Sequence, residues 1–212
     1  MNVRVFFKKI QRAKYISHLD LYRAMGRAVK RAELPVWFTE GFNPHIYMTF
    51  ALPLALGIEG ENEPLDLRLT EEMPFSEITE KLNAALCGAE GLSVNSAAAP
   101  ARNASEIEKA RYEIVTSETE KLADFFSRPE IIIEKKTKNQ TRIIDIKPLI
   151  RFSVDDSAFS VVLPAGAKLN VNPWQVLGAF SEIYGEREIT NVKRTGILCA
   201  DGKEFTASHT TG

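Results

Sequence analysis

The side chains best suited to chemistry in this sequence are cations near its start. The first 31 residues carry nine Lys or Arg and one acid, whereas the other 181 have a net charge of −9. Four of these cations, Arg23, Arg27, Lys30 and Arg31, lie in the segment SHLDLYRAMGRAVKRA. At about 100° per residue they share one side of a helix, where like charges repel one another unless an anion relieves them. Arginine also binds phosphate in a bidentate manner, so the pattern indicates a polyanion such as RNA as the ligand.

More cations stand just before this segment. Lys8, Lys9, Arg12 and Lys14 extend the same basic surface if their connection folds beside the helix. The alternative is an ordinary solvated helix face, since any amphipathic helix must place polar residues outward.

Two of the three histidines, His18 and His45, are the candidates for catalysis. Imidazoles that titrate near neutrality can act as general base and acid when a 2′-hydroxyl attacks an RNA phosphodiester, with arginine stabilising the charge that develops. The alternative is structural: His18 hydrogen-bonds to the loop that contains His45, and His45 orients that loop. Their spacing matches no recognised metal-ligand pattern, so no metal site is predicted.

The sequence Gly41-Phe42-Asn43-Pro44-His45 is the second candidate binding surface. Gly41 allows a positive φ, and Phe42 can present its ring to a nucleobase or lie in the core. We expect Gly41, Phe42, Asn43 and His45 to contact the ligand. Gly57 and Gly60 form neither a P-loop nor a GxGxxG motif, so no nucleotide cofactor is predicted.

The basic residues lie on one side only if their segment is helical, and the pattern of residues 17–32 predicts a helix. Ser17 followed by Asp20 is typical of a capping box. The apolar side chains recur at helical spacing on the side opposite the cations, and they are Leu21, Met25, Ala28, Val29 and Ala32. This side should pack on a sheet.

Hydrophobic periodicity then predicts an α+β fold with two tandem ferredoxin-like units and antiparallel sheets. The first unit, residues 1–96, has strands at 3–7, 35–39, 47–51, 65–69 and 92–96, with helices at 17–32 and 75–86. The acidic run 59–66 is predicted to be a solvated turn. Residues 97–108 form a linker, residues 109–205 the second unit, and residues 206–212, with His209, a mobile tail.

The second unit is predicted to contain one strand pair more than the ferredoxin-like plan requires. Its strands are expected at 112–116, 131–135, 142–146, 151–154, 159–162 and 188–194, and its helices at 118–126 and 173–183. Asn172 followed by Pro173 is a strong signal for the start of the last helix.

Composition excludes several classes of protein. No run of about 18 apolar residues is present, and the first residues lead directly into a strand, so we expect a cytoplasmic protein without membrane contact. Cys87 and Cys199 stand alone, which disfavours zinc, iron–sulfur and thioredoxin-type sites, and both are predicted to be buried in the core.

Residues 15–69 resemble an uncharacterised bacterial domain found fused to, or accompanying, radical-SAM proteins. The resemblance rests on Ser17-His18-Leu19-Asp20, Arg27-Ala28, Gly41-Phe42-Asn43-Pro44-His45 and Leu56-Gly57, with looser matches at 143–150 and from Pro173 to Gly196. It implies a radical-SAM connection but no activity of the domain itself. The chain has no CxxxCxxC motif, so any radical chemistry must come from a partner protein in trans.

A weaker, fold-level analogy links the chain to tandem ferredoxin-like RNA-binding proteins, including CRISPR repeat endoribonucleases. We therefore expect a non-catalytic accessory protein that holds tRNA or rRNA for a radical-SAM modifying enzyme. One alternative is a metal-independent endoribonuclease that uses His18 and His45. Another is a protein-interaction module whose basic helix docks an acidic partner.

Overall fold

In the computed structural model, which describes residues 1–136, 141–155, 158–185 and 189–205, the chain forms two compact units. The first comprises Met1–Ala104 with Phe205, and the second comprises Ser105–Glu204. The predicted tail with His209 lies outside the described residues. No helix of the described residues is long and apolar enough to cross a membrane.

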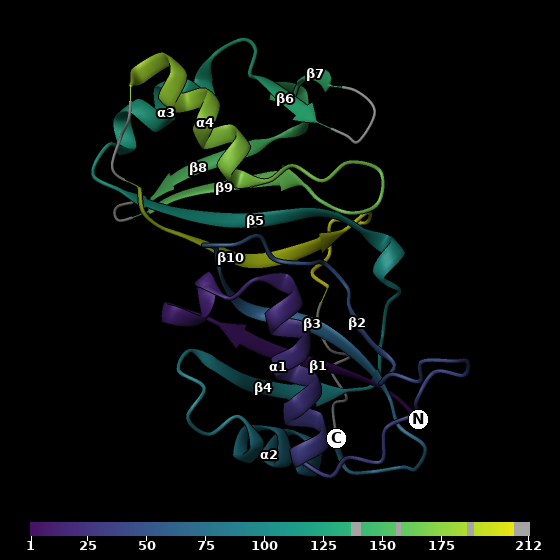
Figure 1. The fold of residues 1–212 in the computed structure, drawn as a ribbon. Coiled ribbons are helices and arrows are strands. Elements are labelled where there is room, and N and C mark those ends of the chain that lie inside the picture. The colour runs from purple at the N-terminus through teal and green to yellow at the C-terminus, as the bar shows by residue number, and fades with distance from the viewer. Residues whose placement is uncertain (137–140, 156–157, 186–188, 206–212) are drawn as a thin grey trace. The chain divides into compact units, whose positions relative to one another are not determined.

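The first unit has a β-α-β-β-α-β order (Figure 1). Its antiparallel sheet has the strand order β4-β1-β3-β2, which is the ferredoxin-like arrangement. The elements are β1 (Asn2–Lys9), a 3-10 turn (Gln11–Tyr15), α1 (His18–Arg31), β2 (Met48–Phe50), β3 (Glu59–Arg68), α2 (Phe75–Ala85) and β4 (Leu92–Ala98).

The core of this unit lies between one face of the sheet and the two helices. Period-2 alternation directs Val3, Val5 and Phe7 of β1 to that face, and Leu65 and Leu67 of β3 join them. The helices contribute Leu21, Met25, Ala28, Val29, Ile78 and Leu82. The apolar face predicted for residues 17–32 is therefore confirmed, since Ala32 is buried as well.

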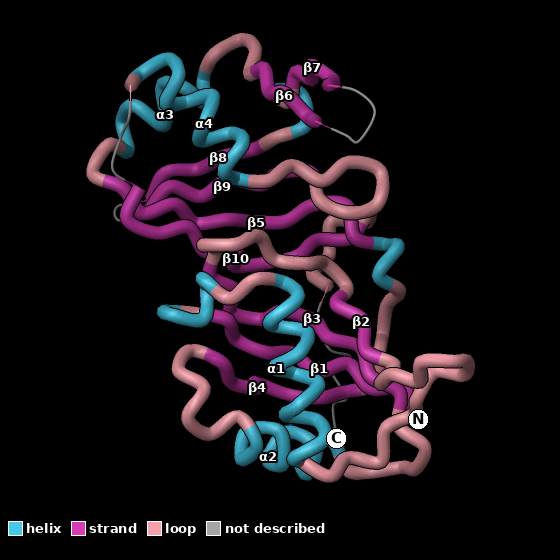
Figure 2. The backbone as a smooth tube through the Cα atoms, in the orientation of Figure 1, coloured by secondary structure: helices cyan, strands magenta, loops and turns pink. Residues whose placement is uncertain are grey.

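The second unit repeats the same order and adds a hairpin. Its sheet runs β10-β5-β9-β8, and β6 pairs with β7 in a separate two-stranded sheet, which Figure 2 shows beside α4. Without this hairpin the unit is again β-α-β-β-α-β. The elements are β5 (Ile107–Thr116), α3 (Thr119–Ser127), β6 (Ile132–Lys136), β7 (Thr141–Asp145), β8 (Arg151–Asp155), β9 (Ala158–Pro164), α4 (Pro173–Tyr184) and β10 (Ile189–Cys199), with 3-10 turns at Ala104–Glu106 and Lys147–Leu149. The extra strand pair predicted from the sequence is this insertion.

An aromatic core holds α3 and α4 on the second sheet. Phe126 of α3 packs on Phe159 of β9 with ring centroids 4.9 Å apart, and Phe125 meets Phe180 of α4 at 5.6 Å. The predicted start of α4 is confirmed: the Asn172 side chain accepts a hydrogen bond from the Trp174 N–H, and Gln175 completes a capping box.

Three local predictions are wrong. The acidic run is part of β3 rather than a turn, and Glu59 and Glu63 are buried within it. Residues 35–39 form isolated bridges, Val36 to Leu69 and Phe38 to Ile46, instead of a strand. Cys199 is buried as expected, but Cys87 is exposed, because it follows the last turn of α2.

Candidate nucleic-acid interface

The helix that carries the basic residues starts where the sequence predicts. The Ser17 hydroxyl oxygen accepts a hydrogen bond from the Asp20 N–H at 3.2 Å and donates one to the Asp20 carboxylate at 2.7 Å. The carboxylate thus bonds the cap side chain, a variant of the expected capping box. This cap fixes where α1 begins.

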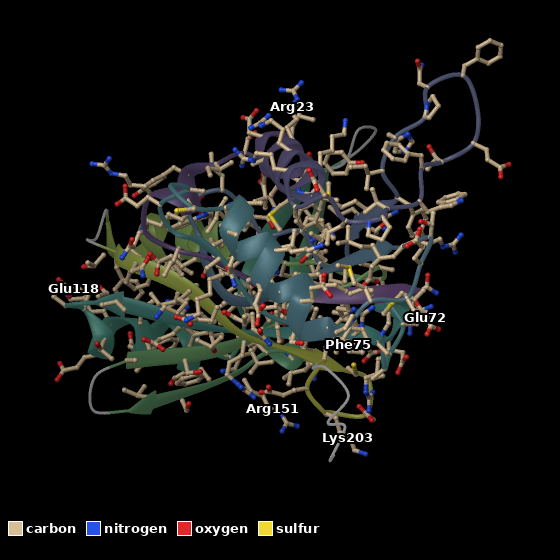
Figure 3. The ribbon with its side chains drawn as sticks, turned by 90° about the horizontal axis from the view of Figure 1, so that it is seen from below. Arg23, Glu72, Phe75, Glu118, Arg151 and Lys203 are labelled. Atoms are coloured by element: carbon tan, nitrogen blue, oxygen red, sulfur yellow. The ribbon has the colours of Figure 1, made fainter. Side chains whose placement is uncertain are left out.

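The four predicted cations of α1 all lie on its exposed side. Arg23, Arg27, Lys30 and Arg31 are exposed while the opposite side of the helix is buried, and Arg23 points outward in Figure 3. Arg23 makes a surface ion pair with Asp20 at 3.4 Å, in which both side chains are more than half exposed. Such a pair contributes little to stability and can exchange for a phosphate contact.

The remaining three cations on α1 have no carboxylate within ion-pair distance among the described residues. Lys30 and Arg31 are in the last turn of α1, where the helix dipole stabilises positive charge. The dipole does not account for Arg27, which is one turn earlier and has Arg23 and Arg31 at i−4 and i+4. The uncompensated part of the surface is therefore centred on Arg27.

The charge of this surface also acts on Asp20. The Ser17 hydroxyl is the main cause of a lowered pKa at Asp20, and the charges of Arg23 and Arg27 lower this pKa further. Asp20 therefore stays ionised at neutral pH. Arg27 influences it through space, without an ion pair.

Of the four cations predicted to extend the basic surface, two lie on the surface of the first unit and two do not. Arg12 is 84% exposed and lies 3.6 Å from Glu90, and Lys8 is 40% exposed and lies 3.8 Å from Glu61. Both remain available to a ligand at the cost of a weak surface pair.

Lys9 and Lys14 do not extend the surface. Lys9 is 1% exposed, and its ammonium donates a hydrogen bond to the Lys14 carbonyl oxygen at 3.3 Å. Lys14 faces Glu59 at 3.9 Å, and both of these side chains are largely buried. Acidic residues of β3 thus neutralise some of the cations in the first 31 residues once the chain is folded. The order of charges along the sequence does not show this.

The Gly41–His45 sequence forms an exposed loop closed at its base. The Thr39 N–H donates to the His45 carbonyl oxygen at 2.8 Å, and the Phe38–Ile46 bridge lies below it. Gly41 has a φ of +123°, the positive value that the sequence predicts. Phe42 is fully exposed, so the alternative of a core position is wrong.

The two histidines have separate roles. The His18 ring packs edge-to-face on Phe50 at 5.2 Å. His45 Nδ1 lies 3.0 Å from Thr39 Oγ1 and 3.2 Å from the Asn43 carbonyl oxygen, so His45 orients its own loop. Among the described residues, the structure shows no contact between the two imidazole rings. It also shows no hydrogen bond from His18 to the loop, which the sequence had predicted. Acid–base cleavage would require both groups at one phosphodiester.

A hydrogen bond joins the helix to the base of the loop. The Tyr22 hydroxyl on α1 donates to the Ile46 carbonyl oxygen at the base of the loop, at 3.4 Å. This bond ties the base of the loop to α1, and the loop itself carries the exposed ring of Phe42. We refer to Arg23, Arg27, Lys30, Arg31 and Phe42 as the basic–aromatic surface.

Arg68, at the base of the loop, was not among the site residues predicted from the sequence. The Arg68 guanidinium lies over the rings of Trp37 and Tyr47, 5.0 Å from each centroid, and donates to the Asn2 side chain at 3.3 Å. Arg68 ends β3, so only strand register reveals that it meets aromatic residues from residues 36–47. An exposed arginine held by two rings is preorganised for an anion.

The described residues contain no cluster of three or more His, Cys, Asp or Glu side chains that could hold a metal ion.

Comparison with known proteins gives a family. A search of curated proteins found no match. The family model described as "Uncharacterized protein conserved in bacteria (DUF2344)" matches residues 2–173, which include the whole basic–aromatic surface and most of the chain. The chain belongs to this conserved bacterial family.

Proposed function

We propose that this protein binds RNA through the basic–aromatic surface and serves as an accessory protein to an RNA-modifying enzyme. The observation that carries the proposal is the run Arg27, Lys30 and Arg31, which has no carboxylate within ion-pair distance in the described part of the chain. RNA supplies anions for these cations through its phosphate backbone. The exposed Phe42 ring adds a stacking surface for an unpaired base.

The place of the RNA is the outer side of α1, which differs from the usual RNA surface of a ferredoxin-like unit. RRM domains bind RNA on the open sheet face through exposed aromatic rings. Here that face carries the buried Arg4, which pairs with Asp66 and lies under the Phe205 ring. Binding along α1 therefore leaves this packed face undisturbed.

The enzyme partner in this proposal is a radical-SAM protein acting in trans on tRNA or rRNA. The support for it is the resemblance carried by the 17–20 and 41–45 motifs, and it concerns the context of the domain rather than any contact. The RNA-binding part of the proposal does not depend on it.

RNA crosslinking and sequencing in the native cells tests the proposal. The variant is Arg23→Glu/Arg27→Glu/Arg31→Glu, and the matched control is Lys168→Glu, a 91% exposed cation of the second unit. We expect one defined tRNA or rRNA region to be enriched with the wild type and the control and lost with the triple variant. Equal enrichment with all three proteins would refute the surface, and no enrichment with any would refute RNA binding.

The same samples distinguish the two other functions. Capture of an acidic protein that survives nuclease treatment and depends on Arg27 would replace RNA with a protein ligand. Cleavage of the enriched RNA by purified protein, abolished by His18→Ala/His45→Ala, would replace accessory binding with catalysis.

A further inference from the structure

The second unit contains a groove that RNA binding does not use. It runs between α4 and the β6–β7 hairpin, has a volume of about 480 Å³, and has the last turn of α3 at one end. The Gln175 side chain of α4 donates to the Glu134 carbonyl oxygen of β6 at 3.2 Å and so ties the two sides together. The groove is therefore a feature of one folded unit.

Three isoleucines with large exposed fractions border this groove. Ile132 of β6 is 43% exposed, Ile143 of β7 is 72% exposed, and Ile183 of α4 is 48% exposed. Ile143 stands directly opposite Glu134 across the hairpin, and Ile132 is the diagonal neighbour on the same face. Scattered exposed apolar residues are ordinary, but three around one groove mark an interaction surface.

The charged residues of the groove are mostly acidic. Glu130, Glu134 and Glu182 line it, all three are exposed, and none has a cation within ion-pair distance among the described residues. Arg128, the one cation among the described residues that line it, hydrogen-bonds to Tyr184. A partner that covers the isoleucines therefore gains from carrying positive charge at its edges.

The floor of the groove allows close approach. Gly178 and Ala179 are the smallest residues on this side of α4, and a Cβ added at Gly178 would meet no atom within 4 Å. The opposite side of the same helix, with Val176, Leu177 and Phe180, is buried in the core. The space above Gly178 is thus open, and the helix beneath it is held by the core. A partner could insert side chains at this position.

We propose that this groove binds a partner protein through an amphipathic segment that carries Leu, Ile or Met on one side and Lys or Arg along the edges of that side. The apolar side covers Ile132, Ile143 and Ile183, and the cations meet the three glutamates. This is a docking mode in which apolar anchors supply affinity and charges set the orientation. The proposal uses only the second unit and stands whether or not the first unit binds RNA.

The probe for the test is a fluorescein-labelled helical peptide of Leu, Lys and Ala, about five turns long, with Leu on one side and Lys along the edges of that side. We expect saturable binding in the micromolar range by fluorescence anisotropy. Ile143→Lys should weaken it at least about tenfold, because it removes an anchor and adds a like charge. Gly178→Leu should do the same by filling the groove, while leucine favours the helix more than glycine does.

The matched control is Leu149→Lys, a 41% exposed leucine that borders a different apolar hollow of the same unit. It should bind the peptide as the wild type does, and a peptide with Glu in place of Lys should not bind. Circular dichroism and an unchanged urea unfolding transition show that each variant is folded.

No saturable binding, or equal binding by the Ile143→Lys and Gly178→Leu variants, would overturn the proposal. A dimer seen by sedimentation velocity and lost in Ile143→Lys would also overturn it, since the occupant would then be a second copy of this chain.

Discussion

Arg4 and Asp66 form a bidentate ion pair across β1 and β3 of the first unit. Arg4 Nε lies 2.6 Å from Asp66 Oδ1, and Nη2 lies 2.8 Å from Oδ2. The two residues are direct cross-strand neighbours, Arg4 is 2% exposed, and its Nη1 donates to the Arg102 carbonyl oxygen at 2.8 Å. The pair thus joins the sheet to the segment that follows β4.

Removing one partner of this pair should destabilise the first unit. Arg4→Met leaves the Asp66 carboxylate without its charge partner, and we expect the free energy of unfolding to fall by about 3 kcal/mol. Urea unfolding followed by Trp37 fluorescence in a Trp174→Phe background reports this unit alone, since the chain has two tryptophans. Adding Asp66→Leu to Arg4→Met should restore part of the loss, and strictly additive losses would show that the pair is not coupled.

Salt dependence should report how many cations meet RNA phosphates. Five phosphate contacts, made by the four cations on α1 and by Arg12, predict a fall in affinity of about 100-fold between about 50 and 200 mM salt. Arg27→Ala should reduce the slope of log K against log salt by about 0.7. Lys9→Met should leave the slope unchanged, because Lys9 is buried. A slope near zero in the wild type would contradict a phosphate interface.

Substitution of Phe42 should change RNA affinity without changing the stability of the fold. Because the ring is fully exposed, Phe42→Ala should change the free energy of unfolding by less than about 0.5 kcal/mol. The same change should weaken RNA binding by about 1 to 3 kcal/mol if one base stacks on the ring. Phe42→Trp should retain affinity. An alanine variant that binds RNA as the wild type does would show that the loop makes no stacking contact.

Asp20 should titrate below the ordinary carboxyl range, because the Ser17 hydrogen bond is the largest cause of its lowered pKa. A lowered native pKa means that the contribution of Asp20 to stability is complete above the ordinary value of 3.8 and is lost as the pH falls through the native pKa. NMR titration of the Asp20 carboxyl carbon measures the value directly. Ser17→Ala should raise it more than Arg27→Ala does, and the reverse order would contradict the assigned cause.

The two cysteines should react differently with thiol reagents. Cys87 is exposed and Cys199 is 3% exposed, so a thiol-reactive dye should label one site per native chain and two after denaturation. Cys87→Ser should abolish labelling of the native protein. Rapid labelling of Cys199 in that variant would indicate that the second unit opens readily.

Most of the fold was predictable from local sequence. The capped start of α1 at Ser17, the apolar side of that helix and the Asn172-Pro173 start of α4 are set by neighbours in the chain, and the structure confirms them. The α+β ferredoxin-like plan follows from the order of these elements. In the second unit periodicity also identifies β6 and β7, but it cannot show that they pair with each other in a separate sheet.

The parts that sequence reasoning missed depend on contacts between distant residues. From the sequence, Glu59 and Glu63 are predicted to be solvated, because no neighbouring residue indicates that they lie beside the cations of the first 31 residues. In the structure Glu59 lies beside Lys14, which is 45 residues earlier in the chain. Arg68 likewise gains its aromatic partners Trp37 and Tyr47 only through strand register. Long-range electrostatic compensation of this kind requires the three-dimensional structure.

The hairpin of β6 and β7 is an insertion between α3 and β8 that the second sheet does not need. Because the strand order β10-β5-β9-β8 is complete without it, substitutions in the hairpin can reshape what the groove recognises while the sheet keeps its own core. The second unit thus separates an adaptable recognition element from a constant scaffold, and changes of partner need not cost the stability of the fold.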